Sequence, residues 1–376
     1  MVPLIVASEI WGCATNVVAL DLLPDRLIAI CPGGRWAVPN GKFEPDLVVN
    51  PQRMPFDAWN PATHLLHLGG NEFVGPPFGV PSSAAQFQNQ WFLGSDRGVF
   101  QYAPSGWMEV PDPGQQPITR VHGLSSIQQR YLIGGLGGTF LGVPGNWRRL
   151  SSESLQSSTR DQNGVWFLLG SGSVNKIDLK TLDVTVSGLH GAVKRPQATA
   201  LGSTGATTLF GLYGGWAEKD GKQTREKYPP ELKGEFVTAI AGDTGTRWIG
   251  TQVSGLWRFN QGTQQNWNPA SGLEDPWVTS IIVDKVQVWV GTYGSGLYTV
   301  AKGKLKSHDC PTQKVRRMAL WGGNLVVGGL DGAWVQIKGQ WRTFDTKGME
   351  TTGISVVGQS VWIMTPLGSL RFSPPK

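Results

Sequence analysis

Short apolar runs that end in a glycine recur along this chain. Four runs show the pattern clearly and a fifth is a looser copy: residues 91–94, 131–134, 209–211, 326–328 and, as the looser copy, 166–170. After the glycine come a short turn, a second glycine and another strand-like segment. Apolar runs this short, separated by glycines, predict β-strands joined by tight hairpins rather than amphipathic helices.

The clearest internal repeat lies in the second half of the chain. Segments 236–259 and 277–300 share landmark residues at a constant offset of 41. The matching pairs are Val237 and Val278, Thr238 and Thr279, Ile240 and Ile281, Asp243 and Asp284, Trp248 and Trp289, Thr251 and Thr292, and Leu256 and Leu297. So many identities at one offset indicate two copies of one structural unit.

The same period extends over most of the chain. The first glycines of the runs lie at positions 94, 134, 170, 211, 250, 291 and 328, with spacings of 36 to 41 residues. A period near forty residues is typical of a β-propeller, in which each repeat forms one small twisted sheet. We expect the glycines of the repeat to permit positive φ at the hairpin turn, where a side chain would clash. Neighbouring sheets would then stack and bury each other's apolar faces.

The pattern therefore predicts an all-β fold, with a single β-propeller domain over residues 1–376. Residues 27–38 read as one more degenerate repeat, which brings the count to about nine blades. Residues 51–81 are an insertion or a further degenerate blade, so the expected range is about eight to ten. The last repeat ends one strand short, and we expect Leu4–Ala7 to close the ring by pairing into the last blade.

Composition agrees with many short strands and turns, because the chain has 51 glycines and 25 prolines but only 16% charged residues. The formal charge of +6 favours anionic partners. Cys13, Cys31 and Cys310 are odd in number and lack metal-ligand spacing, so they support neither a disulfide framework nor a zinc site. We see no secretory signal and no apolar window long enough for a membrane span, and we expect a soluble, cytoplasmic protein.

Two neighbouring repeats carry a more specific set of residues. These are Gly272-Leu273, Val278–Ile281, Asp284, Trp289–Thr292 and Gly296-Leu297, together with Asp243, Trp248–Thr251 and Gly255–Trp257 in the preceding repeat. In these residues, about a third of the chain resembles the two-component regulator propeller repeat. The resemblance implies a propeller that serves as an extracytoplasmic sensor region joined to a membrane helix and a histidine kinase, with the repeats as scaffold. This sequence shows no kinase segment and no membrane span, so the fold is the part that the resemblance carries over.

The residues most suggestive of chemistry have structural interpretations. Asp161, Asp243 and Asp284 recur before the second strand of their repeats, where a carboxylate accepts backbone N–H groups and fixes a hairpin. His64 and His67 are three residues apart, which on a strand sends the side chains to opposite faces. We therefore expect no catalytic residues, no metal site and no cofactor.

A basic stretch runs from Lys302 to Arg317. It fits an acidic partner or a solvated outer strand about equally well. It lacks the interleaved aromatic residues on which single-stranded nucleic acid would stack, so we do not expect nucleic acid as a partner.

The best candidate binding surface is the propeller face that gathers the turns between second and third strands and the connections between blades. Aromatic and arginine side chains at such positions are common interface anchors. The residues predicted to bind there are Asp96, Arg97, Tyr213, Gln252, Asp275, Trp277, Tyr293 and Asp331. The leading hypothesis is a non-catalytic scaffold or subunit that binds a protein partner, with an acidic protein as one option. The alternatives are a sensor that binds a small-molecule ligand, and a lyase or hydrolase with its site in the axial funnel.

Overall fold

The computed structural model describes residues 4–12, 16–46, 56–75, 79–111, 113–114, 116–162, 164–186, 197–221 and 223–374. These residues form an all-β fold of ten sheets with two short 3-10 helices, η1 (Pro230–Leu232) and η2 (Pro269–Ser271). Nine sheets have four or five strands and one has three. The all-β β-propeller class expected from the sequence is thus observed.

Seven consecutive sheets form a ring, each an antiparallel meander of strands in chain order. The first four comprise β14 (Val121–Ile127), β15 (Arg130–Gly135), β16 (Gly138–Val143) and β17 (Asn146–Ser151); β18 (Leu155–Arg160), β19 (Gly164–Leu169), β20 (Val174–Asp178) and β21 (Val184–Val186); β22 (Ala198–Ser203), β23 (Thr208–Leu212), β24 (Gly215–Asp220) and β25 (Gln223–Lys227); and β26 (Val237–Gly242), β27 (Thr246–Thr251), β28 (Leu256–Asn260) and β29 (Thr263–Trp267). The last three comprise β30 (Val278–Val283), β31 (Val288–Thr292), β32 (Leu297–Ala301) and β33 (Lys304–His308); β34 (Arg317–Trp321), β35 (Asn324–Gly328), β36 (Ala333–Ile337) and β37 (Gln340–Phe344); and β38 (Gly353–Val357), β39 (Ser360–Met364) and β40 (Gly368–Phe372).

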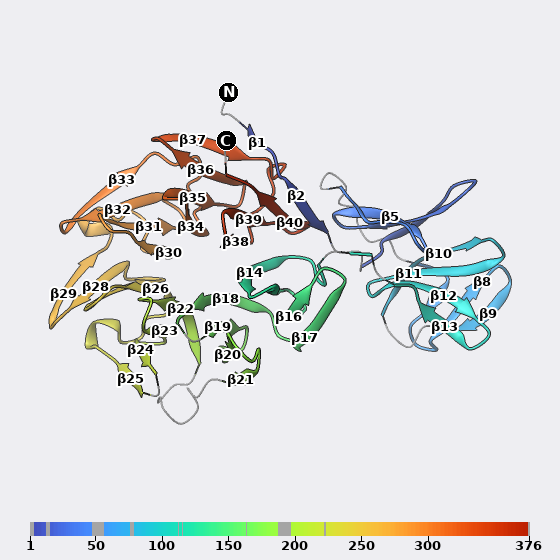
Figure 1. The fold of residues 1–376 in the computed structure, drawn as a ribbon, viewed down its shortest axis with the longest axis horizontal. Helices are drawn as coiled ribbons and strands as arrows, with labels where there is room; N and C mark the ends of the chain where they lie inside the picture. The colour runs from blue at the N-terminus through green and yellow to red at the C-terminus, as the bar shows by residue number, and fades with distance from the viewer. Residues whose placement is uncertain are drawn as a thin grey trace.

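The seven sheets pack in a cycle around one axis (Figure 1). The first strand of each sheet contacts the first strand of the next, and β38 of the last sheet contacts β14 of the first. The apolar core divides in the same way, because each buried cluster lies between two neighbouring sheets. One of these clusters joins the last sheet to the first through Trp362, Met364 and Val121. We call these seven sheets the ring.

Two N-terminal strands complete sheets at the end of the chain. β2 (Glu9–Gly12) pairs antiparallel with β40, so it supplies the strand that the last sheet lacks. The expectation for Leu4–Ala7 was wrong by one sheet, because β1 (Leu4–Ile5) pairs in parallel with β37 of the sheet before. The side chain of Trp11 on β2 is buried beside Trp362, with ring centroids 4.4 Å apart.

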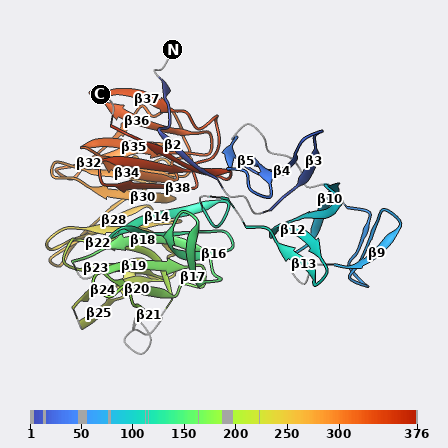
Figure 2. The same ribbon diagram turned by 45° about the vertical axis from the view of Figure 1, so that its right-hand side comes forward.

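Three further sheets lie outside the ring, as Figure 2 shows, and we call them the side lobe. They comprise β3 (Ala19–Leu22), β4 (Leu27–Cys31), β5 (Gly34–Val38) and β6 (Glu44–Pro45); β7 (Trp59–Asn60), β8 (Leu65–Leu68) and β9 (Asn71–Val74); and β10 (Pro81–Phe87), β11 (Gln90–Ser95), β12 (Gly98–Ala103) and β13 (Gly106–Glu109). The ten sheets fall within the expected range, but they do not share one ring. Whether residues 1–376 behave as one domain stays a prediction.

The first glycine of the repeat fits the next sheet rather than the turn. Gly250 and Gly291 have no positive φ, in contrast to the second glycines Gly255 and Gly296 with φ of 87° and 79°. A methyl group on Gly250 would lie 2.6 Å from Cγ1 of Val278, the first residue of the next sheet. The expected positive φ at the hairpin turn is therefore confirmed for the second glycines and wrong for the first ones, which make room for a buried side chain of the neighbouring blade.

In the looser copy, residues 166–170, the large and the small residue of this contact exchange places. Leu168, rather than Gly170, occupies the position equivalent to Gly291. Leu168 pairs with Ser157 on the first strand of its sheet, as Gly291 pairs with Ser280. The next sheet there begins with the small residue Ala198, and both side chains lie in one buried cluster. A large residue opposite a small one thus replaces glycine opposite valine.

The side lobe uses the same contacts between its own sheets. The Ser82 hydroxyl on β10 donates to the Val17 carbonyl just before β3, as Thr238 donates to Val278 in the ring. Phe43 of the lobe packs where a side chain on Gly12 of β2 would otherwise lie. The chain leaves and re-enters the ring at one place, because the Gln116 N–H donates to the Gly12 carbonyl at 3.2 Å.

Candidate functional site

The turns between second and third strands and the connections between sheets lie at one end of the ring, because an up-and-down meander places both there. We call this end the turn face. Six of the eight predicted binding residues lie on it: Tyr213, Gln252, Asp275, Trp277, Tyr293 and Asp331. They come from four consecutive sheets. Asp96 and Arg97 are not part of this face, because the β11–β12 turn belongs to the side lobe.

An aromatic group lies where the β23–β24 turn meets the next sheet. Tyr213 forms an isolated antiparallel bridge with Phe236, and the Gln252 N–H donates to the Phe236 carbonyl at 3.1 Å. Tyr213 and Phe236 are each 45% exposed, and both are among the exposed large hydrophobic residues of the described chain. The backbone thus presents two rings to solvent at a fixed spacing.

A cavity of about 460 Å³ opens beside Tyr213. Its lining comes from the β23–β24 turn and from the connection that contains η1: Tyr213, Gly214, Tyr228, Pro229, Pro230, Lys233 and Gly234. The volume is in the range of pockets that accept a side chain or a small ligand. The tyrosines and prolines give it largely apolar walls, and Lys233 adds one cation to the lining.

The second aromatic group lies on the sheet that begins with β30. Trp277 and Tyr293 stack with ring centroids 4.4 Å apart and an interplanar angle of 22°. Asp275 organises the surrounding loop by accepting the N–H of Trp277 at 2.9 Å and that of Gly294. The aspartate is therefore a loop-fixing residue, while the two rings form a flat apolar surface.

Two expected turn aspartates do what the sequence suggested. Asp161 accepts the Gly164 N–H at 2.8 Å, and Asp243 accepts the Thr246 N–H at 3.2 Å. Asp284 instead accepts the N–H of its neighbour Lys285 at 2.7 Å.

The basic stretch is split by the fold, because Lys304 lies on the outer strand β33 whereas Arg317 begins the innermost strand β34.

Sequence reasoning missed part of the turn face. Phe236 and Tyr228 were not chosen, although Phe236 occupies the position equivalent to Trp277 at the offset of 41. The cluster around Glu350 was also missed: Arg316 was noted only as part of the basic stretch, and Arg120 was not chosen. The neighbouring prolines Pro229 and Pro230 were the available signal for the cavity, because they stiffen the connection that lines it.

Two features are absent from the described part of the chain. No helix there is long and apolar enough to cross a membrane. No group of three or more His, Cys, Asp or Glu side chains in the described ranges is placed to hold a metal ion.

Comparisons with solved structures show the fold. The extracellular domain of the hybrid two-component system BT3049 from B. thetaiotaomicron superposes with a TM-score of 0.60 at 16% identity, over 95% of this chain and 51% of that domain. The WD40 β-propeller domain of Doa1 gives 0.53 at 12% identity, over 69% and 94% of the two chains. YCF48 bound to a D1 peptide gives 0.54 at 12% identity, with the same coverages. This chain thus spans about half the length of the BT3049 domain.

These likenesses confirm the propeller architecture and agree with the resemblance to two-component regulator propellers. No family model and no curated protein matches the sequence. The identities are low enough that the likeness concerns the fold alone. The expected cytoplasmic location therefore stays a prediction beside a neighbour that is an extracellular domain.

Proposed function

We propose that this chain is a non-catalytic β-propeller that binds another protein through its turn face, as a scaffold or as a subunit of a larger complex. The observation that carries the proposal is the exposed pair Tyr213 and Phe236 beside the cavity with Tyr228 and Pro230. Exposed aromatic rings next to a preformed pocket are typical anchors of protein interfaces. The Trp277–Tyr293 stack extends the apolar surface to the neighbouring sheet.

A structural neighbour that was solved with a bound peptide gives further support. YCF48, a propeller of similar fold, has been solved with a D1 peptide bound. A propeller of this shape can therefore serve as a peptide-binding platform, and we carry that role over to this chain as part of the proposal.

The test compares two ends of the same ring. Affinity capture from the native source should lose its bound partners when Tyr213 and Phe236 are both changed to alanine. The matched control is Val286→Ser, because Val286 is 80% exposed at the turn between the first two strands, at the opposite end of the ring. Equal capture by both variants would contradict the proposed face.

A small-molecule sensor is the second candidate, and the cavity of about 460 Å³ is the observation that favours it. A thermal-shift screen of sugars, short peptides and aromatic compounds should then find a ligand that stabilises the wild type. The stabilisation should vanish when Tyr228 is changed to alanine. A screen without such a ligand leaves the protein-binding proposal as the better one.

A further inference from the structure

Three arginines and one glutamate meet near the ring axis on the turn face. Glu350, just before β38, accepts hydrogen bonds from Arg120 Nη2 at 3.0 Å and from Arg316 Nη1 at 2.6 Å. Arg120 precedes β14 and Arg316 precedes β34, so three sheets contribute. Arg317, the next residue, donates from Nη1 to the Arg316 carbonyl at 3.0 Å. Two guanidinium groups thus bond to one carboxylate, and the third, that of Arg317, lies close enough to feel its charge.

Arg317 occupies a position that is small in the other six sheets of the ring and in the β10–β13 sheet of the side lobe. It pairs with Gly328 on the second strand, and the residues in the equivalent register are Ser83, Gly123, Ser157, Ala200, Ala239, Ser280 and Gly353. A serine, alanine or glycine therefore meets the packing needs of this position. The arginine departs from what the fold requires, which indicates a purpose other than packing.

The electrostatics of the cluster are unbalanced toward positive charge. Desolvation lowers the pKa of Arg317, the charge of Arg316 lowers it further, and Glu350 is the carboxylate that raises it. His122 on β14 faces the cluster, and burial lowers the pKa of its imidazole. A hydrogen bond between the imidazole and the Leu155 carbonyl raises this pKa, whereas the charges of Arg317, Arg120 and Arg316 lower it. One carboxylate against three guanidinium groups leaves an excess of two positive charges.

We propose that Arg120, Arg316 and Arg317 form a binding site for a doubly charged oxyanion, of which phosphate and a dicarboxylate are the two simplest sources. Guanidinium groups are the preferred protein donors to both, because their planar N–H pairs match two oxygens at once. Two negative charges would neutralise the excess. The site is separate from the aromatic groups, and it does not depend on the proposed protein-binding function.

The test replaces an arginine by the residue at the equivalent position of the preceding sheet, which begins with β30. Arg317→Ser reproduces Ser280, and Arg316→Thr reproduces Thr279, whose hydroxyl bonds to the next sheet. Isothermal titration of the full chain with inorganic phosphate and with succinate should show binding of at least one, weakened about tenfold or more by Arg317→Ser. Lys304→Ser, on an outer strand, should leave the affinity unchanged.

Two further readouts distinguish a ligand site from a structural role. Without anion, Arg317→Ser should raise the melting temperature, because it relieves repulsion; a structural arginine would lower it on removal. In the wild type, the bound anion should raise the pKa of His122, because it offsets the arginine charges that lower this pKa. An NMR titration of the imidazole would measure the change. Binding of only phosphate, or only succinate, identifies the source. Binding of neither, or binding that Arg317→Ser does not change, would overturn the proposal.

Discussion

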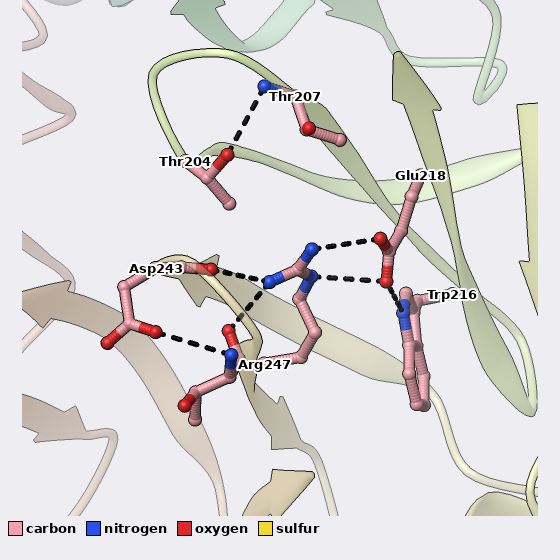
Figure 3. Close-up of polar contacts among 7 residues, drawn as sticks. Thr204, Thr207, Trp216, Glu218, Asp243 and Arg247 are labelled. Atoms are coloured by element: carbon pink, nitrogen blue, oxygen red, sulfur yellow. Dashed lines mark hydrogen bonds and ion pairs between the residues drawn. The ribbon is translucent and has the colours of Figure 1, made fainter. Parts of the chain in front are cut away.

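Arg247 on β27 and Glu218 on β24 form a two-bond ion pair between adjacent sheets of the ring, as Figure 3 shows. Arg247 Nε and Nη2 lie 3.1 and 2.9 Å from the two carboxylate oxygens, and Arg247 Nη1 donates to the carbonyls of Asp243 and Thr246. Trp216 Nε1 donates to the same carboxylate at 2.9 Å. Both ionic side chains are mostly buried, at 13% and 16% exposure.

Glu218→Gln should therefore destabilise the ring by roughly 2 kcal/mol, because it removes the charge from hydrogen bonds that Arg247 and Trp216 make to a carboxylate. Denaturant unfolding followed by tryptophan fluorescence would measure the change. The matched control is Glu109→Gln on an exposed stretch of β13, which should change the free energy of unfolding little. Equal effects of the two substitutions would contradict a special role for the pair.

The same pair predicts a dependence on pH. Burial raises the pKa of Glu218, but the bonds from Arg247 and Trp216 outweigh it, so that the pKa falls below its usual value. A carboxyl group with a lowered folded-state pKa stabilises the protein above its unfolded pKa, and this stability is lost as the pH falls through the folded value. Below pH 4.5 the wild type should thus lose stability faster than Glu218→Gln, in unfolding curves recorded at stepped pH.

The repeat was readable from the sequence, but the purpose of its glycines was not. The sequence shows that glycines recur, whereas the reason lies in a contact between residues of different blades, such as Gly250 and Val278. A hairpin glycine and a packing glycine look alike in one sequence. The backbone angles separate them, because Gly255 and Gly296 have a positive φ whereas Gly250 and Gly291 do not.

Gly250→Ala should destabilise the ring by about 1 to 3 kcal/mol, because the added methyl group overlaps with Val278. The double variant Gly250→Ala with Val278→Ala should recover part of this loss, as Leu168 opposite Ala198 does naturally. Thermal unfolding of the two single variants and the double variant gives the coupling. Additive losses would show that the two positions do not share one packing site.

Blade count was the weakest part of the sequence-based prediction, because local patterns do not reveal which sheets share a ring. Gly94 follows the repeat as faithfully as Gly291, yet its sheet lies in the side lobe, where Val17 fills the space beside it. The residues of the candidate face could be predicted where they lie in turns or connections that the repeat defines, as Tyr213 and Trp277 do. The arginine cluster was not, since it depends on three sheets meeting at the axis.

The side lobe should be removable without loss of the ring. Gly12 and Gln116 are joined by a backbone hydrogen bond, and Gln116 is further held by a bond from Ser369 Oγ at 2.8 Å. A short glycine-serine loop between these two residues should therefore bridge the deletion. We expect a folded, monodisperse chain with a cooperative thermal transition. A deletion that starts after Trp11 and removes Gln116 is the control, and it should fold less well because Ser369 loses its partner.

Cys310 should react slowly with alkylating reagents in the folded protein. Burial raises the pKa of its thiol from 9.0 to about 11, while a backbone N–H from Thr312 acts against this and the charge of Asp331 adds to it. Two units of pKa leave about a hundredfold less thiolate at neutral pH, and the thiolate is the reactive form. Iodoacetamide labelling at pH 8, with the Cys310 peptide followed by mass spectrometry, should show a rate far below that of the same peptide in denaturant. Asp331→Asn should raise the rate, because it removes a negative charge that disfavours the thiolate, and a rate equal to that of the unfolded chain would contradict the burial of this thiol.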